Sequence, residues 1–211
     1  MARPTFLEQN LIPKNAFSSP RITRNETAAI DLHWVESAGA TVDQIVRYLF
    51  DLGLQDPDDN IDDRYAGANV VIGPDKAVEV VRVNEVSYTA GADGKKRTYT
   101  PEAKKLFGAT YTKYGIKSYQ SYQSTMRYLS PNYKTCSIEI VHPDWTGVFE
   151  DETLSKLRVL LVWLLERYKL PTNRAIRHFD ITRKKCPKCW VDNPGSFYAF
   201  LDTVDSARKL A

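Results

Sequence analysis

Several short segments of the chain alternate between apolar and polar residues with the two-residue period of a strand. The segment 29–34 is the clearest of them and predicts a buried strand. Because side chains alternate between the two faces of a strand, Asp31 and His33 share one face and the neighbouring apolar residues share the other. One face of this strand therefore carries polar chemistry, while the other belongs to a core.

Three more apolar segments predict further strands. Segments 68–72 and 77–83 form a strand pair across a Gly-Pro turn, and 135–141 adds another strand. On the last of these, Glu139 alternates with two isoleucines. The isoleucines face the core, so Glu139 faces the opposite side of the sheet.

Apolar residues at helical spacing predict three helices. The first spans 42–53 and begins at a capping box formed by Thr41 and Gln44. The second runs from 150 to about 169, and its middle is apolar on all sides, which predicts deep burial. The third lies near 196–209. Strands alternating with helices predict a single α/β domain with a mixed central β-sheet flanked by helices.

Polar stretches interrupt this pattern. Residues 1–27 predict an irregular N-terminal arm that precedes a domain over 28–211. Within that domain, 92–133 is a polar insertion that holds seven of the twelve tyrosines, which could stack on sugar rings or simply cover the sheet. The acidic segment 56–63 opens like a calcium loop but lacks its glycine and distal glutamate, so a solvated loop is expected.

Composition is that of an ordinary globular chain. The 211 residues suffice for one domain with a real core, at 43% hydrophobic and 26% charged residues. The net charge of +3 is compatible with an acidic polymer such as a bacterial wall and does not demand nucleic acid. No apolar run predicts a membrane span, and the N-terminus lacks a secretory signal, so synthesis in the cytoplasm is expected.

The run 177–187 carries the most specific chemistry in the chain. His178 and Cys186 stand eight residues apart, and Lys184 precedes the cysteine by two. His33 lies far upstream, near the end of the first predicted strand. Two imidazoles and one thiolate form a three-ligand zinc site with a fourth position open, which is the catalytic arrangement.

Three segments together resemble a known family, the zinc-dependent N-acetylmuramoyl-L-alanine amidases, which include phage lysozyme-type amidases and peptidoglycan recognition proteins. These segments are 29–37, 135–141 and 177–187, and the last agrees in residue type, order and spacing. The extension 142–145 is most similar to the phage or clostridial-type endolysin branch. The resemblance covers most of the chain and implies the fold of that family over the domain, which would be its catalytic domain.

By this resemblance, one zinc ion per chain is held by His33, His178 and Cys186, with Glu139 as general base and Lys184 as electrostatic stabiliser. The implied reaction is hydrolysis of the amide between N-acetylmuramic acid and L-alanine in peptidoglycan. Zinc polarises a carbonyl and acidifies water, a carboxylate can move the proton, and a cation can stabilise the oxyanion.

The resemblance also points to residues that contact substrate. Related enzymes often have a histidine or an aromatic residue near the position of Asn69, and a histidine near that of Thr89. The departures put substrate anchoring in question, and Tyr88 or the inserted tyrosines can substitute. His142 could line the cleft or lie at the surface.

Bacterial peptidoglycan is the expected partner, in a phage or prophage endolysin that lyses the cell wall. Without an export signal, release would depend on a separate membrane-permeabilising protein, a holin. Neither nucleic acid nor membrane insertion is expected. The alternative is a peptidoglycan-binding module of the same fold without catalysis, although Cys186 favours the enzyme.

Each candidate also has a structural explanation. His33 could be a core histidine, Glu139 an ion-pair partner, and Lys184 part of a solvated basic run. Asp31 could orient the imidazole of His33 or pair elsewhere.

The cysteines allow a further reading. Cys186 and Cys189 form a C-x-x-C pair, which could be a redox pair, but Cys189 could equally be a packing residue or a spare thiol. Cys136 alternates inward on its predicted strand and is expected in the core.

Overall fold

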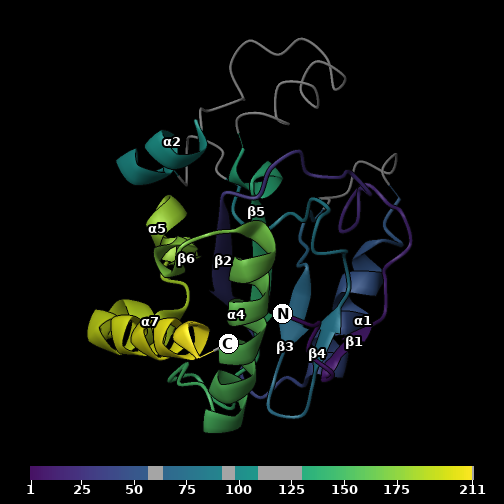
Figure 1. Ribbon diagram of the computed structural model, residues 1–211. Coiled ribbons are helices and arrows are strands. Elements are labelled where there is room, and N and C mark those ends of the chain that lie inside the picture. Colours follow the sequence, from purple (N-terminus) through teal and green to yellow (C-terminus); the bar gives the residue numbers. More distant parts are fainter. Residues whose placement is uncertain (57–63, 92–97, 109–129, 211) are drawn as a thin grey trace.

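A computed structural model describes residues 1–56, 64–91, 98–108 and 130–210. Within these residues, six strands form one sheet in the order β1-β4-β3-β5-β2-β6, with helices on both faces (Figure 1). The strands are β1 (Leu7–Gln9), β2 (Ala29–Trp34), β3 (Val70–Ile72), β4 (Ala77–Glu79), β5 (Thr135–Ile140) and β6 (Ala175–Arg177). The predicted mixed sheet is confirmed.

Most strands of the sheet run in one direction. β2 pairs in parallel with β5 and β6, and β5 pairs in parallel with β3. Only the β3–β4 pair is antiparallel, across the predicted turn. The carboxyl ends of β2, β3, β5 and β6 therefore share one edge of the sheet, where ligands bind in α/β folds.

The three predicted helices are present as α1, α4 and α7, and three shorter helices that were not predicted accompany them in the described residues. The helices are α1 (Val42–Leu52), α2 (Pro101–Phe107), α4 (Asp151–Tyr168), α5 (His178–Thr182), α6 (Lys188–Asp192) and α7 (Pro194–Lys209), with short 3₁₀ turns η1 (Pro131–Tyr133) and η2 (Thr172–Arg174). The capping box of α1 is present, because the Gln44 amide donates to Thr41 Oγ1 at 3.3 Å and the Thr41 amide donates to Gln44 Oε1 at 2.8 Å. No helix in the described part of the chain is long and apolar enough to cross a membrane.

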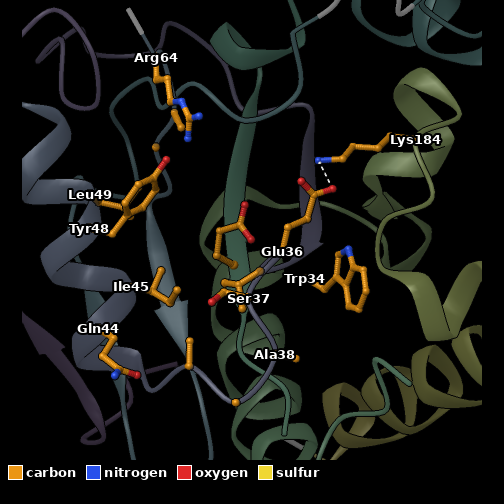
Figure 2. A pocket seen from close by; sticks show the side chains of 16 residues that line it. Trp34, Glu36, Ser37, Ala38, Gln44, Ile45, Tyr48, Leu49, Arg64 and Lys184 are labelled. Carbon is orange, nitrogen blue, oxygen red and sulfur yellow. Dashed lines mark ion pairs between the residues drawn. The ribbon is translucent and has the colours of Figure 1, made fainter. Parts of the chain in front are cut away.

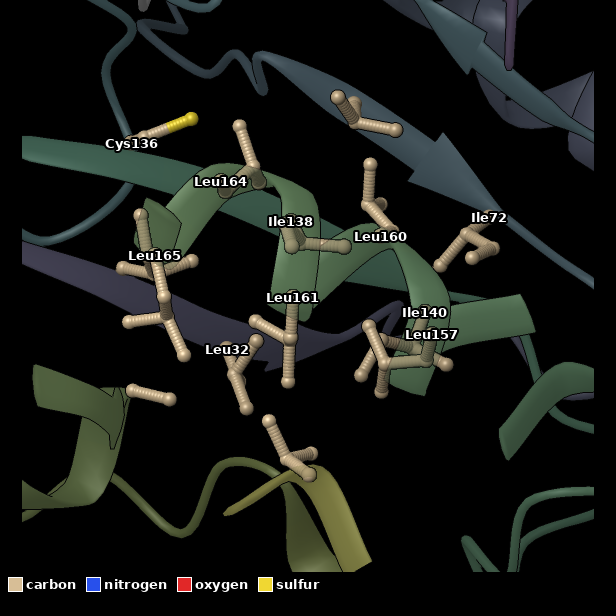
Figure 3. Packing of buried hydrophobic residues seen from close by; sticks show 14 of the residues in the cluster. Leu32, Ile72, Cys136, Ile138, Ile140, Leu157, Leu160, Leu161, Leu164 and Leu165 are labelled. Atoms are coloured by element: carbon tan, nitrogen blue, oxygen red, sulfur yellow. The ribbon is translucent and has the colours of Figure 1, made fainter. Parts of the chain in front are cut away.

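The main core lies between α4 and one face of the sheet (Figure 3). Leu157, Leu160, Leu161, Leu164 and Leu165 of α4 are completely buried. They pack on the inward-facing apolar side chains of β2, β3 and β5, including the predicted core residue Cys136. Burial of these side chains from water drives the packing of α4, and the predicted deep burial of this helix is confirmed.

The opposite face of the sheet is covered unevenly. Val42, Val46 and Leu49 of α1 pack with Val71 of β3 and Val78 of β4. On β2 and β5, this same face carries polar side chains in place of apolar ones. The helix α1 thus covers one half of the face and leaves the half built by β2 and β5 for the candidate site.

The predicted irregular N-terminal arm and the polar insertion both contain short regular elements. The N-terminal arm includes β1, and its residues Ile12 and Phe17 are buried. With one inward apolar residue, Leu7, β1 is too short for its periodicity to be recognised. The tyrosine-rich insertion includes α2 and η1, and its Tyr99 and Tyr133 are buried. The five other tyrosines of the insertion and most of the acidic loop lie outside the described residues.

Asn69 joins the N-terminal arm to the sheet. Its Oδ1 accepts hydrogen bonds from the Ser137 amide at 3.0 Å, Ser87 Oγ at 3.1 Å and Arg24 Nη1 at 3.3 Å. Its Nδ2 donates to the Glu85 carbonyl at 2.9 Å. Asn69 is fully buried, so the structure gives it a structural role and not the substrate contact that the sequence suggested.

Replacing Asn69 with leucine should destabilise the fold. Asn69→Leu leaves several buried donors without an acceptor, and each such group costs about 1–3 kcal/mol, so a loss of roughly 3 kcal/mol or more in unfolding free energy is expected. Urea denaturation would measure it. The same exchange at exposed Asn25 should change stability by less than about 0.5 kcal/mol. Equal stability of the two variants would refute the role of this network.

Candidate active site

Three elements bring the predicted metal ligands together. His33 lies near the carboxyl end of β2, and His178 follows directly on β6 as the first residue of α5. Cys186 follows in the next loop. The ligand atoms of the three residues lie within 4.8 Å of one another, and all three residues are buried. Glu139 of β5 is the direct neighbour of His33 in the parallel register.

Local interactions explain why the second histidine is held in place. The buried Arg177 donates from Nη2 to Asp180 Oδ1 at 2.7 Å and from Nη1 to the Trp190 carbonyl at 2.9 Å. The Phe179 amide donates to the Cys186 carbonyl at 3.0 Å, which closes the loop between histidine and cysteine. A bidentate ion pair and a backbone bond thus fix His178 against Cys186.

The distances suit a tetrahedral metal. The Nδ1 atoms of His33 and His178 are 3.1 Å apart, and Cys186 Sγ is 3.8 Å from His33 Nδ1. Zinc–nitrogen bonds of about 2.0–2.1 Å and a zinc–sulfur bond of about 2.3 Å place tetrahedral ligands about 3.3 Å and about 3.5 Å apart, respectively. The donor set and its spacing therefore fit zinc to within a few tenths of an ångström.

Asp31 orients the first histidine. Its Oδ2 lies 2.7 Å from His33 Nε2 and accepts a 3.2 Å hydrogen bond from Thr89 Oγ1. Burial lowers the pKa of the His33 imidazole, but the charge and hydrogen bond of Asp31 outweigh burial and raise the net pKa well above its usual value. With its Nε2 bound to Asp31, His33 turns Nδ1 toward the other ligands, as metal-binding histidines do.

Glu139 combines burial with an available oxygen. Its Oε1 lies 3.9 Å from His33 Nδ1, and its buried Oε2 has no hydrogen-bond partner among the described residues. Burial, opposed by the charges of His33 and Lys184, raises the pKa of the Glu139 carboxyl to about 7. A buried carboxylate oxygen without a donor is uncommon in a purely structural role and is typical of a functional one.

Lys184 reaches the same cavity from the loop before Cys186. Its Nζ lies 3.0 Å from Glu36 Oε1, the ion pair drawn in Figure 2. Within the described part of the chain, no ion pair joins Lys184 to Glu139. The structure therefore brings Lys184 beside the candidate site but pairs it with an acid that the sequence did not indicate.

A cavity of about 750 Å³ opens next to Glu139 and Lys184. Figure 2 shows Glu36, Trp34 and Lys184 on one side and Tyr48 and Arg64 on the other. The first side comes from the end of β2 and the Cys186 loop, and the second from α1 and the segment after it. The cavity is therefore a cleft between the candidate site and α1, and its volume is within the usual range of ligand-binding pockets.

The remaining predicted substrate residues lie outside this cavity lining. Thr89 supports Asp31 from behind, and Tyr88 is half-buried with its ring edge-on to Tyr65 at 6.1 Å. His142 is buried, with Nδ1 2.6 Å from the Asp144 carbonyl and Nε2 2.7 Å from a second carbonyl. These three side chains thus support the structure around the site.

Glu36, Tyr48 and Arg64 line the cleft from its two sides, but they were not predicted from the sequence. Glu36 follows His33 by three residues, just past the strand, which is a weak positional signal. Tyr48 lies on the outer face of the helical pattern of α1, where an exposed aromatic residue is the available clue. Nothing in the local sequence distinguishes Arg64 from other surface arginines.

The C-x-x-C pair is divided between two environments. Cys186 is buried among the candidate ligands, whereas Cys189 is half-buried and packs against the main core. Both are free thiols, and burial raises the pKa of Cys189 to about 11. A high thiol pKa disfavours the reactive thiolate that a redox pair requires.

Residues 29–189 match the profile of the family described as N-acetylmuramoyl-L-alanine amidase. A probable N-acetylmuramoyl-L-alanine amidase of Bacillus licheniformis is 25% identical over 200 residues, which cover 93% of this chain and 46% of that protein. The chain thus spans about half the length of this curated relative.

Two solved structures share the fold. The PlyG catalytic domain superposes with a TM-score of 0.64 at 14% identity, covering 96% of this chain and 94% of that one. A mutant endolysin from Bacillus subtilis superposes with a TM-score of 0.60 at 18% identity, covering 92% of this chain and 97% of that one. The agreement extends over nearly the whole length of both structures, so the mixed sheet and its helices form a known arrangement.

Exchanging Asp31 for asparagine should weaken metal binding. Asp31→Asn removes the charge that holds the Nε2 proton of His33, and loss of such an outer partner lowers metal affinity about 10–100-fold. Competition with a chromophoric zinc chelator would measure this affinity. The same exchange at Asp205 of α7, outside the site, should leave affinity unchanged, and equal affinities would refute the orienting role of Asp31.

Proposed function

This chain belongs to the N-acetylmuramoyl-L-alanine amidase family, and from that premise we propose that it hydrolyses the amide between N-acetylmuramic acid and L-alanine of bacterial peptidoglycan. The observation that carries the proposal is the buried group of His33, His178 and Cys186 beside Glu139 at an open cleft. A binding module without catalysis has no need of a buried carboxylate oxygen left without a donor at such a cluster.

His33, His178 and Cys186 would hold one zinc ion. When bound, zinc acts as a Lewis acid that polarises a carbonyl and makes water more acidic. Asp31 keeps His33 in the tautomer that this binding requires, and the closed loop of α5 keeps His178 facing it.

Glu139 would move the proton. Its Oε2 can accept a proton from the attacking water, because no described protein group occupies that oxygen. The same carboxyl can then deliver the proton to the leaving nitrogen of L-alanine. Proton transfer by a positioned side chain contributes about 10²–10⁴-fold to a reaction rate.

Lys184 would stabilise the negative charge that develops on the carbonyl oxygen of the scissile amide. Its side chain is only 22% exposed, so the field of its ammonium is screened less than that of a fully exposed surface lysine. Loss of a comparable oxyanion donor lowers kcat about 10²–10³-fold.

Tyr48 and Arg64 would bind the substrate from the opposite wall. The Arg64 guanidinium has no ion-pair partner within the described residues, although its backbone is held by Gln55 at 3.0 Å. Stem peptides carry free carboxylates, which an arginine binds through paired hydrogen bonds. The Tyr48 ring offers an apolar surface beside it.

A role as an endolysin is the finer part of the proposal. It is supported by the shared fold with a Bacillus subtilis endolysin and by the wall substrate proposed above. In that role the protein would act on the wall after a separate holin had permeabilised the membrane.

Loss of the cysteine ligand should abolish metal binding and activity. Cys186→Ser replaces a thiolate with a weak neutral donor, so the purified variant should lose bound zinc and at least about 100-fold in rate. Metal analysis and mass spectrometry of digested peptidoglycan would measure both. Cys189→Ser, which changes the neighbouring half-buried thiol, is the matched control and should keep both properties.

The products released from peptidoglycan distinguish an amidase from a recognition module without catalysis. New L-alanine amino termini with intact glycan chains, abolished by a chelator, would establish the amidase. Binding of peptidoglycan without cleavage would point instead to a recognition module. Cleavage that is indifferent to the chelator would refute the assigned metal ligands.

Removing the Arg64 guanidinium should weaken substrate binding selectively. A lost charge-assisted hydrogen bond is worth about 1.5–3 kcal/mol, so Arg64→Ala should raise KM roughly tenfold or more and leave kcat within about twofold. Steady-state kinetics on soluble muropeptides would separate the two constants. Arg47→Ala is the control, since this exposed side chain of α1 pairs with Asp51. Equal KM values would remove Arg64 from the binding site.

A further inference from the structure

We infer that Glu36 is a positioning residue that holds the Lys184 ammonium in the cleft and keeps it from pairing with Glu139. The inference rests on the proposed function, in which Lys184 and Glu139 act on the same amide. The observation behind it is that Lys184 binds Glu36 at 3.0 Å, while a buried oxygen of Glu139 stays without a donor.

Two catalytic groups of opposite charge in one cleft would tend to neutralise each other. Glu139 and Lys184 both line the cavity, and the charge of Lys184 already lowers the pKa of Glu139 against the effect of burial. Attraction between unit charges grows as the surroundings exclude water. A direct pair would occupy the oxygen that accepts the proton and turn the ammonium away from the oxyanion.

Hydrogen bonds fix the Lys184 backbone, but they do not determine which carboxylate pairs with its ammonium. The preceding Arg183 adopts a left-handed conformation, with φ of 61°. The Lys184 carbonyl accepts from the Cys186 amide at 2.7 Å, and its amide donates to Thr182 Oγ1 at 3.4 Å. The lysine side chain beyond Cα is long and flexible, so the position of Nζ depends on the carboxylate with which it pairs.

Glu36 lies where its carboxylate can hold the Lys184 ammonium away from Glu139. It leaves β2 three residues after His33, and its side chain is 62% exposed, compared with 20% for Glu139. The two carboxylates therefore compete for Lys184 from different depths, with Glu36 at the solvent side. Figure 2 shows the Glu36 side chain reaching toward Lys184 across the mouth of the site.

The neighbouring basic residues have acids of their own. Arg183 pairs with Glu102 at 3.6 Å, and Lys185 pairs with Asp192 at 2.6 Å. Neither of these acids lines the cleft described above. The run thus supplies a matched control, because Glu102 resembles Glu36 in charge and in its basic partner but lies elsewhere.

The test compares Glu36→Gln with Glu102→Gln in the zinc-loaded full chain. Glu36→Gln should lower kcat about tenfold or more with little change in KM, because the ammonium moves onto Glu139. Glu36→Asp keeps the charge and should recover part of the loss, whereas Glu102→Gln should behave as the wild type. In a Lys184→Met background, Glu36→Gln should cause no further loss, since the side chain that it controls is gone.

A crystal structure of the Glu36→Gln variant gives a readout independent of activity. Lys184 Nζ is expected within ion-pair distance of Glu139. Nζ turned away from Glu139, an unchanged kcat in Glu36→Gln, or an equal loss with and without Lys184 would each overturn the inference while leaving an active amidase. If the wild type releases no L-alanine termini, the proposed function fails, and the crystal structure still decides which acid holds Lys184.

Discussion

The alternation of side chains along β2 is the constraint on which both the fold and the site depend. One side of this strand joins the core that buries α4, and the other presents His33, supported by Asp31, to the candidate metal ligands His178 and Cys186. Parallel pairing with β5 places Glu139 directly beside His33, and pairing with β6 delivers His178 at the same edge. A shift of one residue in β2 would exchange the two faces and destroy both the core and the group of candidate metal ligands.

Much of this arrangement could be predicted because it depends on local periodicity and residue chemistry. The buried strand, the capped helix α1 and the deeply buried α4 all have strong patterns, and the loop from His178 to Cys186 has a specific spacing. Features made by distant residues could not be predicted. The buried amide of Asn69 gains its partners from three separate segments, and Arg64 lines the cleft only because α1 packs on β3 and β4 and the chain after it returns to the cleft.

The residues expected to contact substrate show that residue type and position in the sequence are not enough to predict which side chains line a cleft. Thr89 and His142 are polar and lie near the segments of the candidate site, yet Thr89 donates a hydrogen bond to Asp31 and the His142 ring lies between two carbonyl groups. Such support matters for function, since a metal ligand is only as well placed as the groups that hold it. Besides Glu139 and Lys184, the cleft is lined by residues such as Glu36, Tyr48 and Arg64, which no sequence pattern distinguished.

The proposed function also has to overcome a general difficulty of amide hydrolysis at a protein site. The reaction needs a base and a cation close to the same bond, but a base and a cation that are close also attract each other. In the mechanism proposed for this chain, a third charge resolves the conflict, because Glu36 offers Lys184 a partner nearer to solvent than Glu139. An exposed ion pair contributes little to stability. The proposed importance of the Glu36–Lys184 pair is therefore functional: it fixes the position of the Lys184 ammonium and keeps the Glu139 carboxylate unpaired.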